Sequence, residues 1–141
     1  MNTIVTPLVR VGVAPGHTYL LGVAGRRTGR IYWTPVSLVE RGGSRWLVAP
    51  WGERSWVKNA RAAGWVELRR GRRTERVRVE EVPPRERTPI LRDYLRQVPF
   101  TRDFFDAPPG APAEAFAAEA HRHPTFRVLS SDEPSTTLNR L

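Results

Sequence analysis

The sequence predicts an α+β domain built around a small, mostly antiparallel barrel with flanking helices. Three observations support this fold class. The 141 residues fit a single domain, and a hydrophobic content of 40% is enough for one core. Short apolar segments are separated by Gly-containing turns, as in antiparallel hairpins. Helical patterns interrupt these hairpins in the order three strands, helix, two strands, two helices, strand, which is typical of α+β proteins.

The first half of the domain reads as three strands followed by a helix. Pro35 cannot donate a backbone hydrogen bond, so it indicates an edge or a bulge in the second strand. Ser55 is the expected N-cap of the helix, and Gly64 is its expected stop. The expected strands are His17–Ala24, Ile31–Glu40 and Arg45–Pro50, the turns are Gly25–Arg30 and Arg41–Ser44, and the helix is Ser55–Ala63.

The second half reads as a hairpin, two helices and a last strand. Val77 and Val79 alternate with charged residues, which predicts a half-exposed strand that ends before Pro83 and Pro84. Apolar residues in the following segment recur at helical spacing, with Pro89 in the first turn. The expected strands are Trp65–Arg70, Arg73–Val82 and Pro124–Leu129, the helices are Glu86–Val98 and Ala113–Arg122, and Ala107–Pro112 is a loop.

These elements define one domain over residues 17–130, between an N-terminal extension (1–16) and a polar C-terminal tail (131–141). We find no signal-peptide pattern and no apolar run of the roughly 18 residues that a membrane span needs. The absence of Cys excludes disulfides, a Cys nucleophile and thiolate metal sites. The expected location is the cytoplasm, with peripheral membrane association as an open alternative.

The chain is strongly basic, with a net charge of +9 and 23 basic residues, of which only Lys58 is not Arg. Such a domain attracts anions: nucleic acid, an anionic membrane surface or a phosphorylated small molecule. The Arg-rich segment 69–78 resembles a nucleic-acid patch. However, Glu67, Glu75, Glu80 and Glu81 interleave with it, and no aromatic pattern for stacking bases accompanies it. We therefore predict a solvated strand face and no specific nucleic-acid partner.

Two segments contain candidate binding residues. In Gly25–Arg30 two Gly bracket basic residues and Thr28, a combination that suits a phosphate or carboxylate; the alternative is a hairpin turn with solvated Arg. Trp51 and Trp56 are candidates for stacking, or else core residues. Asn59 lies one helical turn after Trp56 and could orient a bound ring or bond a neighbouring backbone group.

Other kinds of site find little support. His121 and His123 lie on different faces of a helix and have no carboxylate-rich partner motif, so we predict no metal. Asp103 and Asp106 lack the pairing of a carboxylate acid–base site. No nucleophile elbow, Walker A or dinucleotide-binding string is present.

The order of the motifs resembles the deazaflavin-dependent nitroreductase family of actinobacteria. The matching motifs, which lie mainly between Tyr19 and Val82, are Leu20–Ala24 followed by Gly25-Arg26-Arg27-Thr28-Gly29, then Thr34-Pro35, the Gly42-Gly43 hairpin, Val48–Gly52 and Trp56–Asn59. The chain departs from the family pattern at Pro50, Trp51 and Glu53.

The resemblance implies a split β-barrel like that of FMN-binding pyridoxamine-phosphate oxidases. It also implies an enzyme that uses 8-hydroxy-5-deazaflavin (coenzyme F-420), whose tail carries phosphate and glutamates. The coenzyme would transfer a hydride to an electron-poor acceptor such as a quinone, enone or nitroaromatic, so no catalytic side chain is required. The implied coenzyme ligands are Arg26, Arg27, Thr28 and Gly29 for the tail, Pro35, Ser37, Ala49, Pro50, Trp51 and Gly52 for the ring, and Ser55, Trp56 and Asn59 to close the pocket.

Three alternatives stay open: an FMN-binding oxidoreductase of the same barrel group, a basic domain that binds nucleic acid or an anionic surface, and a non-catalytic binding domain. The sequence does not decide between a monomer and a homodimer, nor does it identify the acceptor.

Overall fold

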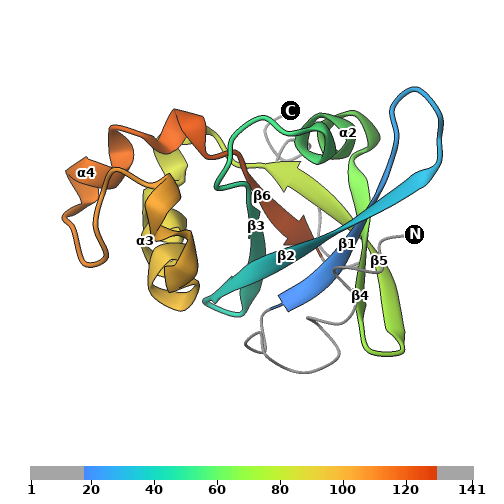
Figure 1. The fold of residues 1–141 in the computed structure, drawn as a ribbon, viewed down its shortest axis with the longest axis horizontal. Coiled ribbons are helices and arrows are strands. Elements are labelled where there is room, and N and C mark those ends of the chain that lie inside the picture. Colours follow the sequence, from blue (N-terminus) through green and yellow to red (C-terminus); the bar gives the residue numbers. More distant parts are fainter. Residues whose placement is uncertain (1–17, 130–141) are drawn as a thin grey trace.

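The computed structural model of the chain describes residues 18–129. The predicted extension (1–16) and the predicted tail (131–141) lie outside the described residues. Six antiparallel strands close into a barrel in the order β1-β2-β3-β6-β5-β4, which confirms the predicted fold class (Figure 1). The strands are β1 (Thr18–Ala24), β2 (Ile31–Arg41), β3 (Ser44–Val48), β4 (Trp65–Arg70), β5 (Arg73–Glu81) and β6 (Thr125–Leu129).

Hairpin turns connect three of the neighbouring strand pairs, β1–β2, β2–β3 and β4–β5. Between β2 and β3, Gly42 and Gly43 have φ of +58° and +81°, as a two-residue turn with two left-handed positions requires. Gly71, with φ of +61°, makes the corresponding turn between β4 and β5. All three hairpin turns predicted from the Gly positions are therefore present.

Strand β2 is paired unevenly, and this asymmetry creates the space for a site. Its first seven residues, 31–37, pair with β1, whereas β3 pairs only with Leu38–Arg41. Pro35 therefore lies where β2 has one neighbour, which confirms the edge predicted for it. Tyr32 and Thr34 stand opposite Val23 and Leu21, so they share the face of β2 that is turned to the barrel interior.

The core has two parts. One fills the barrel and includes Val57 and Ala60 of α2 (Ser55–Ala63), so this helix closes one end of the barrel. The other lies between the barrel and α3 (Thr88–Gln97) and α4 (Ala113–Ala117), which pack on one side of it in Figure 1. Three 3-10 helices complete the fold: η1 (Pro84–Glu86), η2 (Pro99–Phe104) and η3 (Ala120–Arg122).

Three local predictions were wrong. The N-cap of α2 is Arg54 and makes no side-chain cap bond, while Ser55 is the first helical residue. The predicted helix 86–98 starts only at Thr88, because Pro89 in its first turn cannot donate a hydrogen bond to a preceding turn. The predicted helix 113–122 breaks into α4 and η3, because the buried Glu119 carboxylate turns inward to accept two backbone N–H groups.

Candidate functional site

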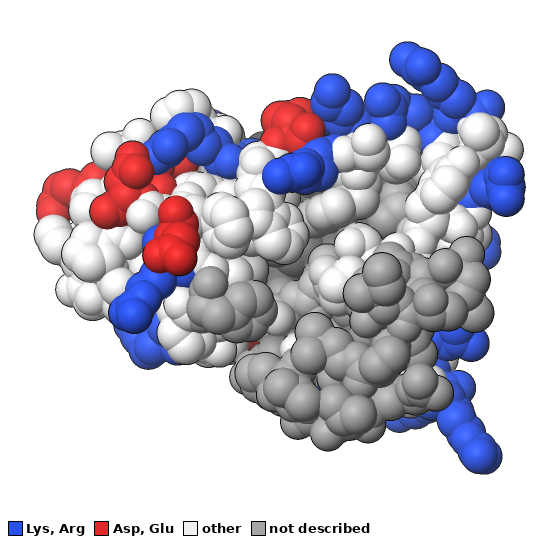
Figure 2. Space-filling model, in the orientation of Figure 1, with Lys and Arg blue, Asp and Glu red and all other residues white. Residues whose placement is uncertain are grey.

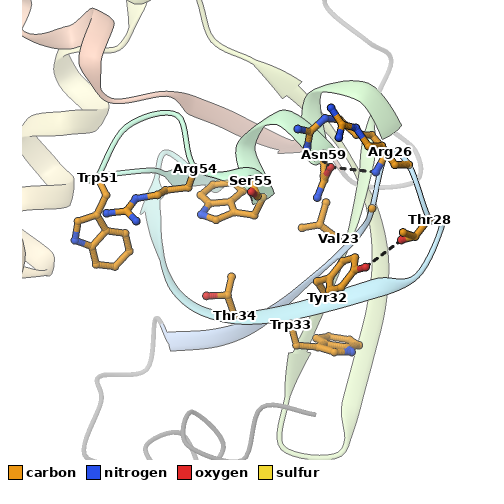
Figure 3. A pocket seen from close by; sticks show the side chains of 13 residues that line it. Val23, Arg26, Thr28, Tyr32, Trp33, Thr34, Trp51, Arg54, Ser55 and Asn59 are labelled. Carbon is orange, nitrogen blue, oxygen red and sulfur yellow. Dashed lines mark hydrogen bonds between the residues drawn. The ribbon is translucent and has the colours of Figure 1, made fainter.

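The site is a cavity of about 710 Å³ at the mouth of the barrel, between α2 and the first half of β2 (Figure 3). Its volume is typical of pockets that hold a cofactor-sized ligand. The lining residues come from β1, the β1–β2 turn, β2 and the segment that leads into α2. They are Val23, Gly25, Arg26, Arg27, Thr28, Tyr32, Trp33, Thr34, Trp51, Arg54, Ser55, Trp56 and Asn59.

The β1–β2 turn forms one end of the cavity and has a fixed shape. The Gly25 N–H donates to the Arg30 carbonyl at 2.7 Å, and the Gly29 N–H donates to the Gly25 carbonyl at 2.8 Å. A Cβ atom on Gly25 would lie 2.7 Å from the Tyr32 ring and from the Thr28 hydroxyl, so a larger residue there would displace these two side chains. The Thr28 and Tyr32 hydroxyls bond each other at 3.1 Å. The turn is thus ordered before any ligand arrives.

Asn59 ties this turn to α2. Its buried Oδ1 accepts hydrogen bonds from the Arg26 backbone N–H at 3.0 Å and from Arg26 Nη1 at 2.7 Å. Of the two interpretations that the sequence left open for Asn59, the structure shows the contact with backbone. One nitrogen of the Arg26 guanidinium is therefore already used by the protein.

Other cations of the turn are free. Arg27 and Arg30 are exposed, and their guanidinium groups have no hydrogen-bond or ion-pair partner among residues 18–129. Figure 2 shows that Lys and Arg side chains gather over this end of the molecule and over the β4–β5 hairpin, whereas acidic side chains are concentrated on the side of α3 and α4. This end of the cavity is suited to an anionic group.

The opposite end of the cavity is aromatic. Trp51 and Phe104 are 45% and 43% exposed, and their rings meet edge to face with centroids 5.4 Å apart. The Arg54 guanidinium lies 6.0 Å from the centre of the Trp51 ring. Between the two ends, Trp56 is half-buried and packs against Phe126 at 6.1 Å. The cavity therefore offers flat apolar walls far from its cationic turn (Figure 3).

Comparison with protein families identifies this chain. The model of the F420H(2)-dependent quinone reductase family matches residues 5–102. The chain belongs to this family. The resemblance inferred from the motifs is thereby confirmed, and the chain is a deazaflavin-dependent oxidoreductase. Among curated proteins, no sequence gives a significant match.

Solved structures share the fold at low sequence identity. An F420-H2 dependent reductase (FDR-A) is 20% identical with a TM-score of 0.57, over 81% of this chain and 95% of that one. An FAD-binding protein from Mesorhizobium loti is 17% identical with a TM-score of 0.54, over 94% and 91%. Atu2129 from Agrobacterium tumefaciens, of unknown function, is 16% identical with a TM-score of 0.61; the match covers 88% of this chain but only 54% of that one.

Seven of the thirteen coenzyme ligands implied by the resemblance line the cavity: Arg26, Arg27, Thr28, Trp51, Ser55, Trp56 and Asn59. The other six do not line it. Gly29 is exposed in the turn, and Ser37, Ala49 and Pro50 are buried. Pro35 is half-buried on β2, and Gly52 has φ of +91° in the loop before α2.

Three of the lining residues missed from the sequence, Val23, Tyr32 and Thr34, follow from strand register. Pro35 and Ser37 alternate with Tyr32 and Thr34, which lie on the opposite face of β2. Tyr32 lies opposite Val23 of β1, and Thr34 lies opposite Leu21. Strand pairing across the Gly25–Arg30 turn could therefore have predicted that Tyr32 and Thr34 line the cavity. The residues missed are Val23, Gly25, Tyr32, Trp33, Thr34 and Arg54.

The basic β4–β5 hairpin is partly neutralised. Arg76 pairs with Glu67 at 3.0 Å across the strands and lies 3.9 Å from the centre of the Trp65 ring. Glu75 pairs instead with Arg45 of β3 at 3.0 Å. Trp65, an aromatic residue that could have stacked on a base, is thus covered by an Arg. Arg69 and Arg70 contact the Trp33 and Tyr19 rings, each at 5.6 Å from the ring centre. The tip residues Arg72 and Arg73 have neither a ring contact nor a hydrogen-bond or ion-pair partner among the described residues.

Behind α2, an ion-pair chain fixes the helix to the barrel. Arg61 contacts Glu81 at 2.7 Å and Glu53 at 2.9 Å, and these hydrogen bonds raise the pKa of the Arg61 guanidinium, Glu81 contributing most. Glu81 also pairs with Arg87, whose side chain is buried and donates to the Val82 and Ala120 carbonyls. Burial lowers the pKa of Arg87. None of these groups is among the residues that line the cavity.

Two kinds of feature are not found in the described part of the chain. No group of three or more His, Asp or Glu side chains between residues 18 and 129 could hold a metal ion. No helix in that range has the length and apolarity needed to cross a membrane.

Proposed function

We propose that the cavity binds coenzyme F-420, with its anionic tail at the β1–β2 turn and its ring toward the tryptophans, and that the enzyme reduces an electron-poor acceptor. One observation supports this proposal above all. A single cavity, in a member of a deazaflavin-dependent family, has the free guanidinium of Arg27 at one end and the exposed Trp51 ring, with Arg54 beside it, at the other. A ligand with a charged tail and a planar ring matches both ends.

The tail end fits phosphate and carboxylate groups. Arg27 has all its donors available. Thr28 contributes a hydroxyl whose oxygen accepts the Arg30 backbone N–H at 3.2 Å. Arg26 keeps the remaining nitrogens of its guanidinium for a ligand while Asn59 holds its backbone. Arginine can bind such groups in a bidentate manner, which fixes the orientation of the tail as well as its position.

The ring end fits a planar heterocycle between Trp56 and the floor made by Val23 and Thr34. When bound and reduced, the coenzyme supplies a hydride from its ring. The side chains around it position the ring and keep water out. Ser55 and Arg54 are the hydrogen-bond donors on this side of the cavity, and they would polarise a carbonyl or nitro oxygen of the acceptor.

The acceptor class follows from the same groups. A quinone, an enone or a nitroaromatic is flat, apolar and carries an oxygen for Ser55 or Arg54, and the exposed pair Trp51 and Phe104 offers such a ring a surface. We favour a quinone, since the family description names one. The proposed partner is thus a small molecule, taken up by a single domain over residues 17–130.

Single-turnover kinetics test this function. Reduced coenzyme F-420 is mixed with the protein and with menadione, an enone or a nitroaromatic, and its reoxidation is followed by absorbance. We expect the protein to accelerate the reoxidation of the reduced deazaflavin by menadione, and not to accelerate the reoxidation of reduced FMN above its rate without protein. No reoxidation with any acceptor, together with tight binding of FMN, would favour the FMN-dependent alternative.

A further inference from the structure

A buried His–Glu pair lies behind the loop that carries Trp51. His123 and Glu119 are each only 2% exposed, and Nε2 of His123 lies 2.7 Å from Oε1 of Glu119. The other ring nitrogen, Nδ1, lies 3.1 Å from the Pro50 carbonyl oxygen. The Phe105 ring stacks on the imidazole with centroids 4.1 Å apart. In the sequence analysis His123 was considered only as a metal ligand, and no metal was predicted.

The hydrogen-bond partners define where the protons are. A carbonyl oxygen can only accept, so Nδ1 of His123 must carry a proton. Both oxygens of Glu119 accept backbone N–H groups, Oε1 from Asp106 at 3.0 Å and Oε2 from Ala107 at 2.7 Å. Two such bonds favour the ionised form of a carboxylate. An ionised Glu119 accepts a hydrogen bond from a protonated Nε2, and this geometry points to an imidazolium at His123.

The charges around this pair agree with that state. Arg122 approaches Oε1 of Glu119 at 3.4 Å and also pairs with Asp106. Arg87 donates to the His123 backbone carbonyl at 3.4 Å and is itself paired with Glu81. Each cation therefore has a carboxylate within contact distance. The flat stack on Phe105 gives the imidazolium a further favourable contact.

His123 holds the loop of residues 49–52. The Pro50 carbonyl is buried, and His123 is its hydrogen-bond donor among the described residues. The Ala49 N–H donates to the Pro124 carbonyl at 2.8 Å, so the loop is attached to the 123–124 segment at two points. Gly52 lies close to the same segment, since a Cβ on it would be 3.5 Å from the Arg122 carbonyl. Trp51 lies between these attachments and is the residue that reaches the cavity.

We propose that His123, as an imidazolium paired with Glu119, is a positioning residue that holds the 49–52 loop and thereby places Trp51 in the cavity wall. The pair would act through Trp51 and would not touch the ligand. The role of His123 in holding the cavity wall does not depend on the ligand. Only the identity of the ligand that contacts Trp51 rests on the proposed function.

The first test observes the protons directly. Two-bond ¹H–¹⁵N correlation spectra of the whole protein distinguish an imidazolium from either neutral tautomer, and comparison with His121→Gln and His123→Gln assigns the signals. At neutral pH we expect the imidazolium pattern for His123, and the exposed His121 serves as the internal comparison. In Glu119→Gln the His123 signals should change to a neutral pattern. A neutral His123 in the wild-type protein would overturn the proposal.

The second test measures the loop. Without the imidazole ring the buried Pro50 carbonyl loses the Nδ1–H donor, so hydrogen exchange at the Ala49 and Gly52 amides should accelerate about tenfold in His123→Gln. The matched control His121→Gln should exchange at the wild-type rate. Equal exchange in both variants would contradict the assigned role. Because these amides are measured without ligand, the result is independent of the proposed function.

The third test connects the pair to the site. Coenzyme affinity should fall about tenfold in His123→Gln, but hardly at all when the same change is made in a Trp51→Ala background, because the effect passes through that ring. An equal loss in both backgrounds would overturn the route through Trp51. If the wild-type protein does not bind the coenzyme, the proposed function fails, while the spectra and the exchange rates still decide the role of His123.

Discussion

Replacing Arg27 by Ala should weaken coenzyme binding without weakening the fold. The Arg27 guanidinium is exposed and has no hydrogen-bond or ion-pair partner between residues 18 and 129, so its removal breaks no intramolecular bond. If it binds the tail, one charge-assisted hydrogen bond is lost, which is worth about 1.5–3 kcal/mol. That loss corresponds to an affinity roughly 10- to 150-fold lower.

Arg26 should behave differently, although it is adjacent in the sequence. Its Nη1 donates to Asn59 at 2.7 Å, so Arg26→Ala removes an internal hydrogen bond as well as a cation. We expect a loss of about 0.5–1.5 kcal/mol in the free energy of unfolding, together with weaker binding. Arg27→Ala thus reports the contact of the turn with the ligand alone, whereas Arg26→Ala also reports the hydrogen bond that anchors the turn to α2.

Isothermal titration calorimetry with oxidised coenzyme F-420 measures both variants. Arg72→Ala is the matched control, since it removes an equally exposed cation from the β4–β5 hairpin. A deazaflavin without the phosphate-containing tail should bind the wild-type protein and Arg27→Ala equally. The reasoning is refuted if Arg26→Ala, Arg27→Ala and the double variant all bind the full coenzyme as tightly as the wild type.

Three further predictions concern the aromatic wall, the buried arginine and the basic hairpin. Coenzyme binding should quench Trp fluorescence, and Trp51→Phe or Trp56→Phe should reduce the quench; a full quench in both variants would place the ring elsewhere. Arg87→Met should lower the free energy of unfolding in urea by about 3 kcal/mol, because it leaves the buried Val82 carbonyl without its donor and removes bonds to the Ala120 carbonyl and to Glu81. Arg85→Met on the surface should change it by less than about 0.5 kcal/mol. Replacing Arg72 and Arg73 together by Ser should change neither the free energy of unfolding nor the coenzyme affinity. Any DNA binding by the wild-type protein should be weak and lost at moderate salt. Tight binding to a defined DNA sequence that disappears in this variant would support the nucleic-acid alternative.

Much of the barrel could be predicted because its signals are local. Apolar alternation marks Val77 and Val79 as inward, and Gly42, Gly43 and Gly71 place the turns, so strand order along the chain and hairpin pairing follow from neighbouring residues. The cationic end of the cavity was also local, since it lies within a single turn of six residues.

The parts that could not be predicted depend on distant contacts. The Ala-rich segment 113–122 has good helix propensity, but Glu119 leaves the helix to bind the Asp106 and Ala107 amides. Arg87 finds its carbonyl acceptor at Ala120, 33 residues away. Phe104 lies in the short helix η2, which has too few residues to show a period, and it reaches Trp51 only through the packing of the helices on the barrel.

The most direct test of the central claim is a crystal structure of the protein with oxidised coenzyme F-420. The account predicts one coenzyme per cavity, with its phosphate within hydrogen-bond distance of Arg27 and Thr28 and its ring against Trp51 or Trp56. A coenzyme bound elsewhere, or with its phosphate away from the β1–β2 turn, would contradict it.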